Sequence, residues 1–544
     1  MSKGQKSFVK GAAILGFAGL IVKIIGAVFR IPLSNIIGTA GMASYQVAYP
    51  IYAALLVIST AGLPTAISRM VSERVSVGDY RSAHKVFQKA FKVLLLIGIV
   101  STAVMLAVSG PVANAAKIPE ARLSLIMIAP SLLFVSLLSA YRGYFQGLQL
   151  MLPTALTQIV EQLIKLAAGL YFASLWWTKE TPHMGAAGAL LGVTLSEVVA
   201  LALIIVMYNR KKWEIKEKRR MLPNTKFKAQ RSILKDLLII ALPIALGGCI
   251  MPLVGAADTF IITNQMAGID YSAYNPLTPK ANYAVLTGLV NPLINMPAVL
   301  SLALCMSLVP ALSEARAIKD QAMVSSRSAM GFRLGLLIGL PCAVGMYLLA
   351  EPIIRLLYAS EKITAAELAV GGELLRILAI GVLFLTLLQT LTGILQGAGH
   401  QFVPLVNLSI GAVVKVALSL ILIRIPSFNI NGAAIGTVAC YGIAAILNMI
   451  SVVRFTRPDI RFLSGFVAPI ISTAVMGAAA WFLFQRLSAS HGNTTSVLVT
   501  ILVAVLVYVV MVFLTGALRH EDMEYIPGGG RITRLMTRLR LWRQ

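Results

Sequence analysis

Charged residues are scarce in this chain, and acidic residues are scarcer than basic ones. Only 12% of the 544 residues are Asp, Glu, Lys or Arg, whereas 58% are hydrophobic. A soluble domain averages about 25% charged residues, so this composition excludes an ordinary water-soluble protein and indicates one that lies in a bilayer. The 21 acidic residues face 47 basic ones, which gives a net charge of +26. The positions of the basic residues along the chain indicate the reason for this excess of positive charge.

Residues that build reactive centres are also few. The four cysteines all lie in apolar stretches, without the spacing of a disulfide framework or a metal site: Cys249, Cys305, Cys342 and Cys440. The five histidines are scattered, and there is no phosphate-binding loop, which excludes ATP hydrolysis by the chain itself. No loop carries a cluster of carboxylates suited to glycosyl transfer. We therefore expect a protein that is not an enzyme; a membrane glycosyltransferase or polymerase is the alternative of a different class.

Long apolar stretches make up most of the sequence. A helix needs about 20 apolar residues to cross a bilayer, and we count about 14 such stretches, the first two at 11–33 and 43–68. Most Lys and Arg residues lie in the tails and in the loops on the side of the N-terminus. This bias predicts a multi-pass protein of the plasma membrane with both termini in the cytoplasm. The positive charge therefore reflects topology, and we expect no nucleic-acid partner.

Three short motifs recur in the second half of the chain. Pro64 and the later Arg81-Ser82-Ala83 reappear 246 residues on, as Pro310 and Arg327-Ser328-Ala329. Gly143 and Gly147 reappear 250 residues on as Gly393 and Gly397, and the Gly-Ala-Ala of 185–187 reappears at 432–434. This displacement covers six predicted helices, an even number, so the halves are parallel repeats, an architecture typical of transporters.

The repeat predicts an all-α integral membrane protein with two six-helix halves and two additional C-terminal helices. The expected boundaries are a first half at 1–208, a basic cytoplasmic linker at 209–232, a second half at 233–460, two extra helices at 461–518 and a basic tail at 519–544. The tail is expected to be either an amphipathic helix on the inner leaflet or plain disorder.

The first predicted helix carries two cations without a neighbouring acid. Lys23 and Arg30 are seven residues apart, about two helical turns, so both project from one face. A charge inside the bilayer is costly and normally faces a cavity or a partner. We interpret this pair as a binding site for an anionic headgroup. The alternative for Arg30 is that its side chain extends to the outer interface.

Further charges lie in the fifth, seventh and eleventh predicted helices. Glu161 and Lys165 form an i, i+4 pair, which either lines the site or is self-neutralising. Lys415 lies 250 residues after Lys165, and these repeat-related lysines suggest opposite walls of one cavity. Asp258 is a carboxylate that could bind Na⁺ or carry a proton, and either would couple transport to an ion gradient.

The span count, the parallel halves and the Gly-x-x-Gln-Gly element at Gly143 and Gly393 resemble the multidrug/oligosaccharidyl-lipid/polysaccharide (MOP) exporter superfamily. The segment Ile37-Gly38-Thr39-Ala40-Gly41 is similar to an element of its polysaccharide-export branch. Within that branch the chain resembles the Gram-positive form of the MurJ group. The resemblance covers nearly the whole chain, and it implies a V-shaped fold of the kind found in multidrug exporters.

The resemblance also implies a substrate and a set of site residues. Family members move a saccharide linked to undecaprenyl pyrophosphate from the inner to the outer leaflet by alternating access. Lys23 matches one cation of the family cavity and Arg30 matches a second with a one-residue shift, whereas the second-helix arginine of the family meets apolar residues near Leu55 and Leu56. A family sodium site would here draw on Asp258, Asn407 and Thr437; no other cofactor is implied. Membrane lipids and cell-wall synthesis proteins are the other expected partners.

The residues leave several functions open. Translocation of the peptidoglycan precursor lipid II is the first expectation, and translocation of another undecaprenyl-linked wall polymer or capsule unit is the second. A cation-coupled drug exporter of the same superfamily is a third, although it should carry a more acidic cavity than one lined by Lys23 and Arg30.

Overall fold

The computed structural model describes residues 3–60, 62–221, 233–459 and 463–518, and all regular structure in these ranges is helical. The all-α fold predicted from the sequence is therefore confirmed. The basic tail at 519–544, and with it the choice between an amphipathic helix and disorder, lies outside the described residues, as does 222–232 of the predicted linker.

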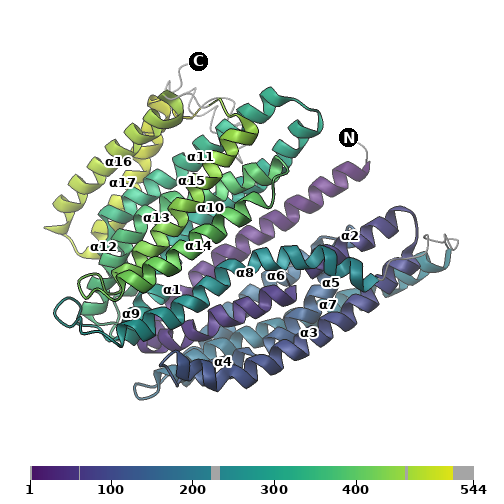
Figure 1. The fold of residues 1–544 in the computed structure, drawn as a ribbon, viewed down its shortest axis with the longest axis horizontal. Coiled ribbons are helices and arrows are strands. Elements are labelled where there is room, and N and C mark those ends of the chain that lie inside the picture. The colour runs from purple at the N-terminus through teal and green to yellow at the C-terminus, as the bar shows by residue number, and fades with distance from the viewer. Residues whose placement is uncertain (1–2, 61, 222–232, 460–462, 519–544) are drawn as a thin grey trace. The chain divides into compact units, whose positions relative to one another are not determined.

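The chain packs as two compact units, Met1–Ala267 with Pro279–Ala284 and Gly268–Thr278 with Val285–Gln544. The helices of unit 1 are α1 (Lys3–Thr60), α2 (Leu63–Ser76), α3 (Tyr80–Ala115), α4 (Ala121–Ile128), α5 (Ser131–Gly147), α6 (Leu152–Trp176), α7 (Pro182–Met221), α8 (Ile233–Met266) and α9 (Pro279–Ala284), labelled in Figure 1. The helices of unit 2 are η1 (Val285–Val290), α10 (Asn291–Ala317), α11 (Gln321–Leu348), α12 (Ala350–Tyr358), α13 (Ala365–Gly397), α14 (Val403–Leu422), α15 (Asn431–Thr456), η2 (Leu463–Val467), α16 (Ala468–Ser488) and α17 (Asn493–Leu514).

Helix α8 packs with unit 1, although the sequence repeat assigns it to the second half. Its first turns place Ile233, Leu237 and Ala241 in one buried apolar cluster with Leu63 and Ile67 of α2. Burial of these side chains supplies the hydrophobic free energy that joins α8 to this unit. The predicted halves at 1–208 and 233–460 describe sequence repetition, and as domains they stay a prediction.

Helix α1 consists of two helical arms that meet at Gly38. This residue has φ 64° and ψ −178°, a backbone conformation that glycine adopts readily and residues with a Cβ rarely do. Gly41 lies in the following turn, where an added Cβ would be 2.9 Å from the Pro182 carbonyl oxygen. The two apolar stretches predicted at 11–33 and 43–68 thus fall largely on the two arms of α1. The glycines of the 37–41 segment permit the sharp bend between them.

The repeated glycines make equivalent helix contacts in the two units. A Cβ added to Gly147 would be 2.6 Å from Val71 Cβ, because α5 lies directly against α2 there. A Cβ added to Gly397 would be 2.8 Å from Leu312 Cβ, where α13 lies against α10. The Gly-x-x-Gln-Gly element therefore serves the same purpose twice: its small residues let two backbones approach closely.

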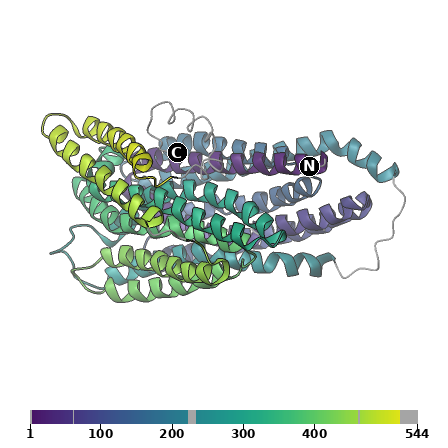
Figure 2. The ribbon, with the colours of Figure 1, turned by 90° about the horizontal axis from the view of Figure 1, so that it is seen from above.

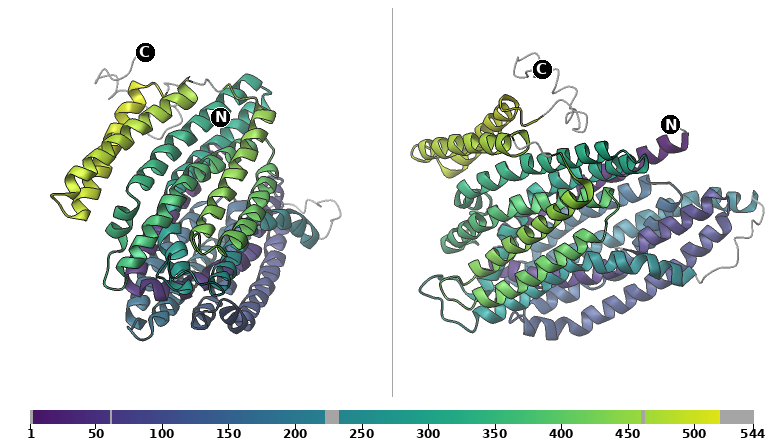
Figure 3. Two further views of the ribbon diagram at one scale, coloured as in Figure 1. Left: turned by 60° about the vertical axis from the view of Figure 1, so that its left-hand side comes forward. Right: turned by 45° about the horizontal axis from the view of Figure 1, so that its top comes forward.

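The two extra C-terminal helices form a pair in unit 2. Figures 2 and 3 show α16 and α17, drawn in yellow-green and yellow, side by side. The Ser472 and Thr515 hydroxyls are 2.9 Å apart across this pair, and Tyr508 of α17 donates a hydrogen bond of 2.7 Å to the Leu337 carbonyl of α11. The outer face of α17 is apolar and exposed, with Leu502 and Leu506 as examples. This is the surface expected of helices that face lipid.

Twelve helical segments in the described ranges are long and apolar enough to cross a membrane. One of them, Ile14–Val57, contains both arms of α1 and counts once. The multi-pass membrane protein predicted from the sequence is confirmed, and a total of about 14 crossings is compatible with these helices. The orientation of the termini stays a prediction.

Candidate functional site

The two arms of α1 bring Arg30 against an aromatic ring. Arg30 Cζ lies 5.1 Å from the centroid of the Tyr49 ring. Residues 19 positions apart in a straight helix would be separated by about 28 Å, so the bend at Gly38 places the arms side by side. A guanidinium over an aromatic face is stabilised by a cation–π interaction, which is stronger where water is excluded. Arg30 is half-buried at this position.

Lys165 of α6 meets the same ring. Its Nζ lies 5.5 Å from the ring centroids of both Tyr49 and Phe29. Tyr49 stacks on Tyr45, with centroids 5.6 Å apart and an interplanar angle of 13°. The structure thus gathers Arg30 and Lys165, two cations predicted separately as site residues, around one tyrosine.

Glu161 pairs across the bundle with an arginine of α5. Arg142 Nη2 is 2.8 Å from Glu161 Oε2, and the two side chains are only 12% and 15% exposed. Arg142 Nε donates to Thr157 Oγ1 at 3.2 Å, and Gln162 Nε2 donates to Glu161 Oε1 at 3.1 Å. A charge-assisted hydrogen bond of this length is stronger than an i, i+4 pair at a helix surface. The close ion pair of Glu161 is therefore with Arg142, while Lys165 lies within electrostatic range of the same carboxylate.

Glu197 of α7 adds a second carboxyl group. Its side chain is 4% exposed, and its Oε2 has no hydrogen-bond partner within the described part of the chain. Glu161, Arg142 and Lys165 all lie within electrostatic range of it. We define the unit 1 charge cluster as Arg30, Arg142, Glu161, Lys165 and Glu197, with Tyr49 in contact with Arg30 and Lys165. With every member ionised this cluster has three positive charges and two negative ones, so it favours an anion.

Lys23 lies on the first arm of α1, and its side chain is exposed. Seven helical residues place it about 10 Å from Arg30 along the same arm. It thus extends the cationic face of α1 beyond the cluster without joining it. Its predicted contact with a substrate stays a prediction.

Lys415 occupies the position in unit 2 that corresponds to Lys165. It lies in α14 and is 6% exposed. Nearby, an added Cβ on Gly436 of α15 would be 3.1 Å from the Lys415 carbonyl oxygen, so α14 and α15 are in close contact there. Because the two lysines belong to different units, the shared cavity predicted for them stays a prediction.

The three residues of the predicted sodium site have oxygen donors that suit a hard cation. Asn407 Nδ2 donates to Asn448 Oδ1 at 2.9 Å, and Thr437 Oγ1 donates to the Ala433 carbonyl at 3.0 Å, so both side chains already hold defined positions in unit 2. Asp258, the one carboxylate of the set, is buried in α8 of unit 1. Over the described ranges, no group of three or more His, Cys, Asp and Glu side chains is placed to hold a metal. Sodium binding stays a prediction, and no step below depends on it.

Sequence reasoning missed Arg142. This residue directly precedes Gly143 of the repeated glycine element, inside the stretch predicted to be the fourth membrane helix. A guanidinium inside an apolar stretch is the sequence signal that marks it. Its pairing with Glu161 could not have been found in that way, because the ion pair joins two helices.

Comparison with known proteins agrees with this architecture. The family model described as "Polysaccharide biosynthesis protein" matches residues 8–316, and the MatE model matches residues 243–421. Among relatives, the Bacillus subtilis lipid II flippase MurJ is 26% identical, with 96% of this chain and 98% of the relative covered. Stage V sporulation protein B of the same organism is 24% identical, with 97% and 99% covered.

Solved structures show the same fold at lower sequence identity. The inward closed conformation of the lipid II flippase MurJ superposes with a TM-score of 0.67 at 14% identity, covering 92% of this chain and 98% of that one. An inward-facing multidrug transporter of the MATE family gives 0.66 at 16% identity, covering 80% and 96%. These likenesses show the fold, and the full-length similarity to a lipid II flippase places the chain among transporters rather than enzymes, as predicted. The full-length similarity to MurJ and to stage V sporulation protein B bears out the predicted resemblance to the MurJ-like exporters of the MOP superfamily, and the chain belongs to the polysaccharide biosynthesis protein family.

Proposed function

We propose that this protein is a flippase for a saccharide carried on prenyl pyrophosphate, and that its substrate is lipid II. The observation that carries the proposal is the gathering of Arg30 and Lys165 around Tyr49 in unit 1. A pyrophosphate brings at least two negative charges, and two cations in a partly dehydrated site match them. The whole-length relative named lipid II flippase supports the choice of substrate.

Each cluster member has a distinct part in this proposal. The Arg30 guanidinium offers paired N–H donors to one phosphate, and the Lys165 ammonium offers a point charge to the other. Tyr49 contacts both cations, and in this proposal it holds them away from ion pairing with a carboxylate. Arg142 neutralises Glu161, so that this carboxylate does not repel the arriving headgroup. Lys23, seven residues before Arg30 on α1, attracts the headgroup before the headgroup reaches the cluster.

Transport then requires a conformational change that exposes the cluster first to one side of the membrane and then to the other. The charged headgroup moves with the cluster while the prenyl tail remains in lipid. A ligand can drive such a change only if it binds the two conformations differently. The pyrophosphate supplies that difference if the second conformation separates Arg30 from Lys165 and releases the anion.

A second candidate substrate is another prenyl-linked wall polymer. Stage V sporulation protein B and the uncharacterised membrane protein YabM match this chain over nearly their full lengths, as closely as the lipid II flippase does. The pyrophosphate is common to all such carriers, so the cluster would bind each of them. A drug exporter for organic cations is disfavoured, because a cluster with excess positive charge repels them.

Depletion of the protein tests the choice of substrate. Membranes from depleted cells should accumulate one lipid-linked precursor in the inner leaflet, and we expect lipid II. Re-expression of the wild-type chain should remove the excess, whereas re-expression with Arg30→Gln and Lys165→Gln at equal protein level should not. Accumulation of a different prenyl-linked saccharide would favour the second candidate, and no accumulation of any would contradict the flippase proposal.

A further inference from the structure

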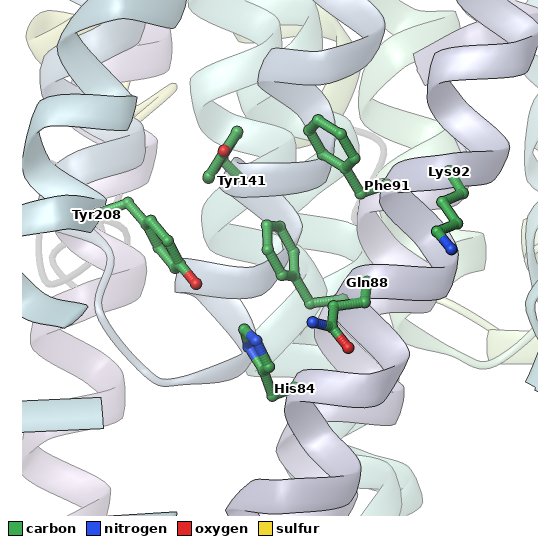
Figure 4. Close-up of a pocket in the computed structure, with 7 residues that line it drawn as sticks. His84, Gln88, Phe91, Lys92, Tyr141 and Tyr208 are labelled. Atoms are coloured by element: carbon green, nitrogen blue, oxygen red, sulfur yellow. The ribbon is translucent and has the colours of Figure 1, made fainter. Parts of the chain in front are cut away.

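A cavity outside the charge cluster opens in unit 1 where α3, α5 and α7 meet. Its volume is about 390 Å³. Seven side chains line it, six of them labelled in Figure 4: His84, Phe87, Gln88, Phe91, Lys92, Tyr141 and Tyr208. The lining comes from the first part of α3 and from the ends of the membrane-spanning parts of α5 and α7. The cavity therefore lies at one membrane boundary of unit 1.

The floor of this cavity is a set of packed aromatic rings. The Phe87 ring centroid is 5.2 Å from that of Tyr141 and 5.7 Å from that of Tyr208. The two tyrosine rings meet edge to face, with centroids 5.4 Å apart and an interplanar angle of 67°. Such contacts fix the rings in place and leave their hydroxyl ends at the cavity. A rigid apolar floor suits a ligand that is partly apolar.

The rim of the cavity is polar, and none of the seven lining side chains is acidic. Figure 4 shows the Tyr208 hydroxyl, the His84 ring and the Gln88 amide turned toward the same space, with Lys92 farther along α3. A hydroxyl, an amide and an ammonium together supply hydrogen-bond donors and one positive charge. These groups match a singly charged phosphodiester better than a cation or a neutral sugar.

One exposed face of α3 extends from the cavity rim, and the residues on it indicate what kind of ligand would fit. Lys85, Lys89 and Lys92 follow one another at i, i+4 and i+7, so they share one face of the helix. The same face then continues with Leu96 and Ile99, whose side chains are 63% and 49% exposed. Cations followed by exposed apolar residues along one helix complement a molecule with an anionic head and hydrocarbon chains.

We propose that this cavity binds the headgroup of an anionic phospholipid, whose acyl chains lie along the Leu96–Ile99 face of α3. The site is distinct from the charge cluster, since its lining shares no residue with it. A bound lipid would contact α3, α5 and α7 at once and so stabilise unit 1. Free phosphate has the same charged group but would make no use of the apolar face.

The full-length protein in lipid nanodiscs tests this proposal. Retained lipids are counted by native mass spectrometry, and thermal unfolding is followed as phosphatidylglycerol replaces phosphatidylcholine. The wild type should prefer phosphatidylglycerol by about tenfold, the size of one charge-assisted hydrogen bond. The double variant Lys92→Gln, Tyr208→Phe should lose this preference. The matched control is Lys179→Gln, an exposed lysine between α6 and α7 that does not line the cavity, and it should keep the preference.

Three outcomes would overturn the proposal. The first is an unchanged lipid preference in the double variant. The second is an equal loss in Lys179→Gln, which would show diffuse attraction between a basic protein and anionic lipid. The third is equal stabilisation by inorganic phosphate in phosphatidylcholine nanodiscs, which would assign the cavity to free phosphate. Lys92→Gln alone provides a variant that should fold normally, because its side chain is exposed.

Discussion

The two units carry different chemistry at positions that the sequence repeat makes equivalent. In unit 1 an ion pair joins Arg142 to Glu161, with Thr157 bonded to the arginine. In unit 2 a neutral network runs from Asn407 through Asn448 to Thr392. Adding 250 to the unit 1 positions gives the unit 2 residues: Arg142 becomes Thr392, Thr157 becomes Asn407, Glu161 becomes Gly411 and Lys165 becomes Lys415.

The scaffold that holds these positions is shared, whereas the ion pair is not. Gly147 and Gly397 permit the same close helix contact in the two units. The ion pair of unit 1, by contrast, is replaced by the hydroxyl of Thr392 and by Gly411 in unit 2, which keeps only the lysine, as Lys415. Buried charge is costly to maintain and is most often retained for a function. The difference therefore favours unit 1 as the part of the molecule that would recognise the proposed anionic headgroup.

The largest expected effect comes from breaking the ion pair of unit 1. Arg142→Ala leaves Glu161 buried without its partner, and we expect a loss of about 3–5 kcal/mol in the free energy of unfolding. Thr392→Ala in unit 2 removes one neutral hydrogen bond and should cost about 1 kcal/mol. Thermal unfolding in detergent measures both. The double variant Arg142→Ala, Glu161→Ala should recover much of the loss, and equal costs for Arg142→Ala and Thr392→Ala would remove the contrast between the units.

The glycine contacts should give equal effects in the two units. Gly147→Ala and Gly397→Ala each place a Cβ within 2.6 and 2.8 Å of the facing helix, so each should destabilise its unit by about 1–3 kcal/mol. Gly345→Ala is the matched control, because an added Cβ there meets nothing within 4 Å. A large difference between Gly147→Ala and Gly397→Ala would show that the scaffold is not shared after all.

Substrate binding should depend on Arg30 and Lys165 of unit 1 more than on Lys415 of unit 2. Arg30→Gln and Lys165→Gln should each weaken binding of a prenyl-pyrophosphate saccharide by roughly 10- to 100-fold, the worth of a charged hydrogen bond. Lys415→Gln should weaken it by less. Dissociation constants measured with purified protein check this order, and prenyl alcohol, which lacks the pyrophosphate, provides a ligand that should be insensitive to all three changes.

The smallest expected effect is a gain in affinity. Glu197→Gln replaces a buried carboxyl group with a neutral amide of the same size, and we expect the change in binding to stay within about 1 kcal/mol, or roughly fivefold. The variant should bind the pyrophosphate ligand more tightly and the prenyl alcohol equally. Weaker binding of the pyrophosphate ligand would mean that Glu197 holds the cluster together instead of opposing the anion.

The sequence predicted the fold class and several members of the site, but not how the members meet. Apolar run length identified the membrane helices, and the charges inside those runs identified Arg30 and Lys165 as candidate site residues. Their shared contact with Tyr49 depends on the bend at Gly38, which joins residues 19 positions apart. The partner of Glu161 could not be predicted, because helical periodicity describes neighbours on one helix only. Arg142 reaches it from α5 because the packing of the bundle sets the register between helices.

Cross-linking at Tyr49 tests the central claim most directly. With p-benzoylphenylalanine in place of Tyr49, illumination in the presence of a lipid-linked pyrophosphate saccharide should attach the saccharide to the protein. Unlabelled ligand should compete, and Arg30→Gln with Lys165→Gln in the same chain should abolish the adduct. An adduct of equal yield in that triple variant, or none at position 49 while the protein still transports its substrate, would contradict the assignment of headgroup binding to the unit 1 charge cluster.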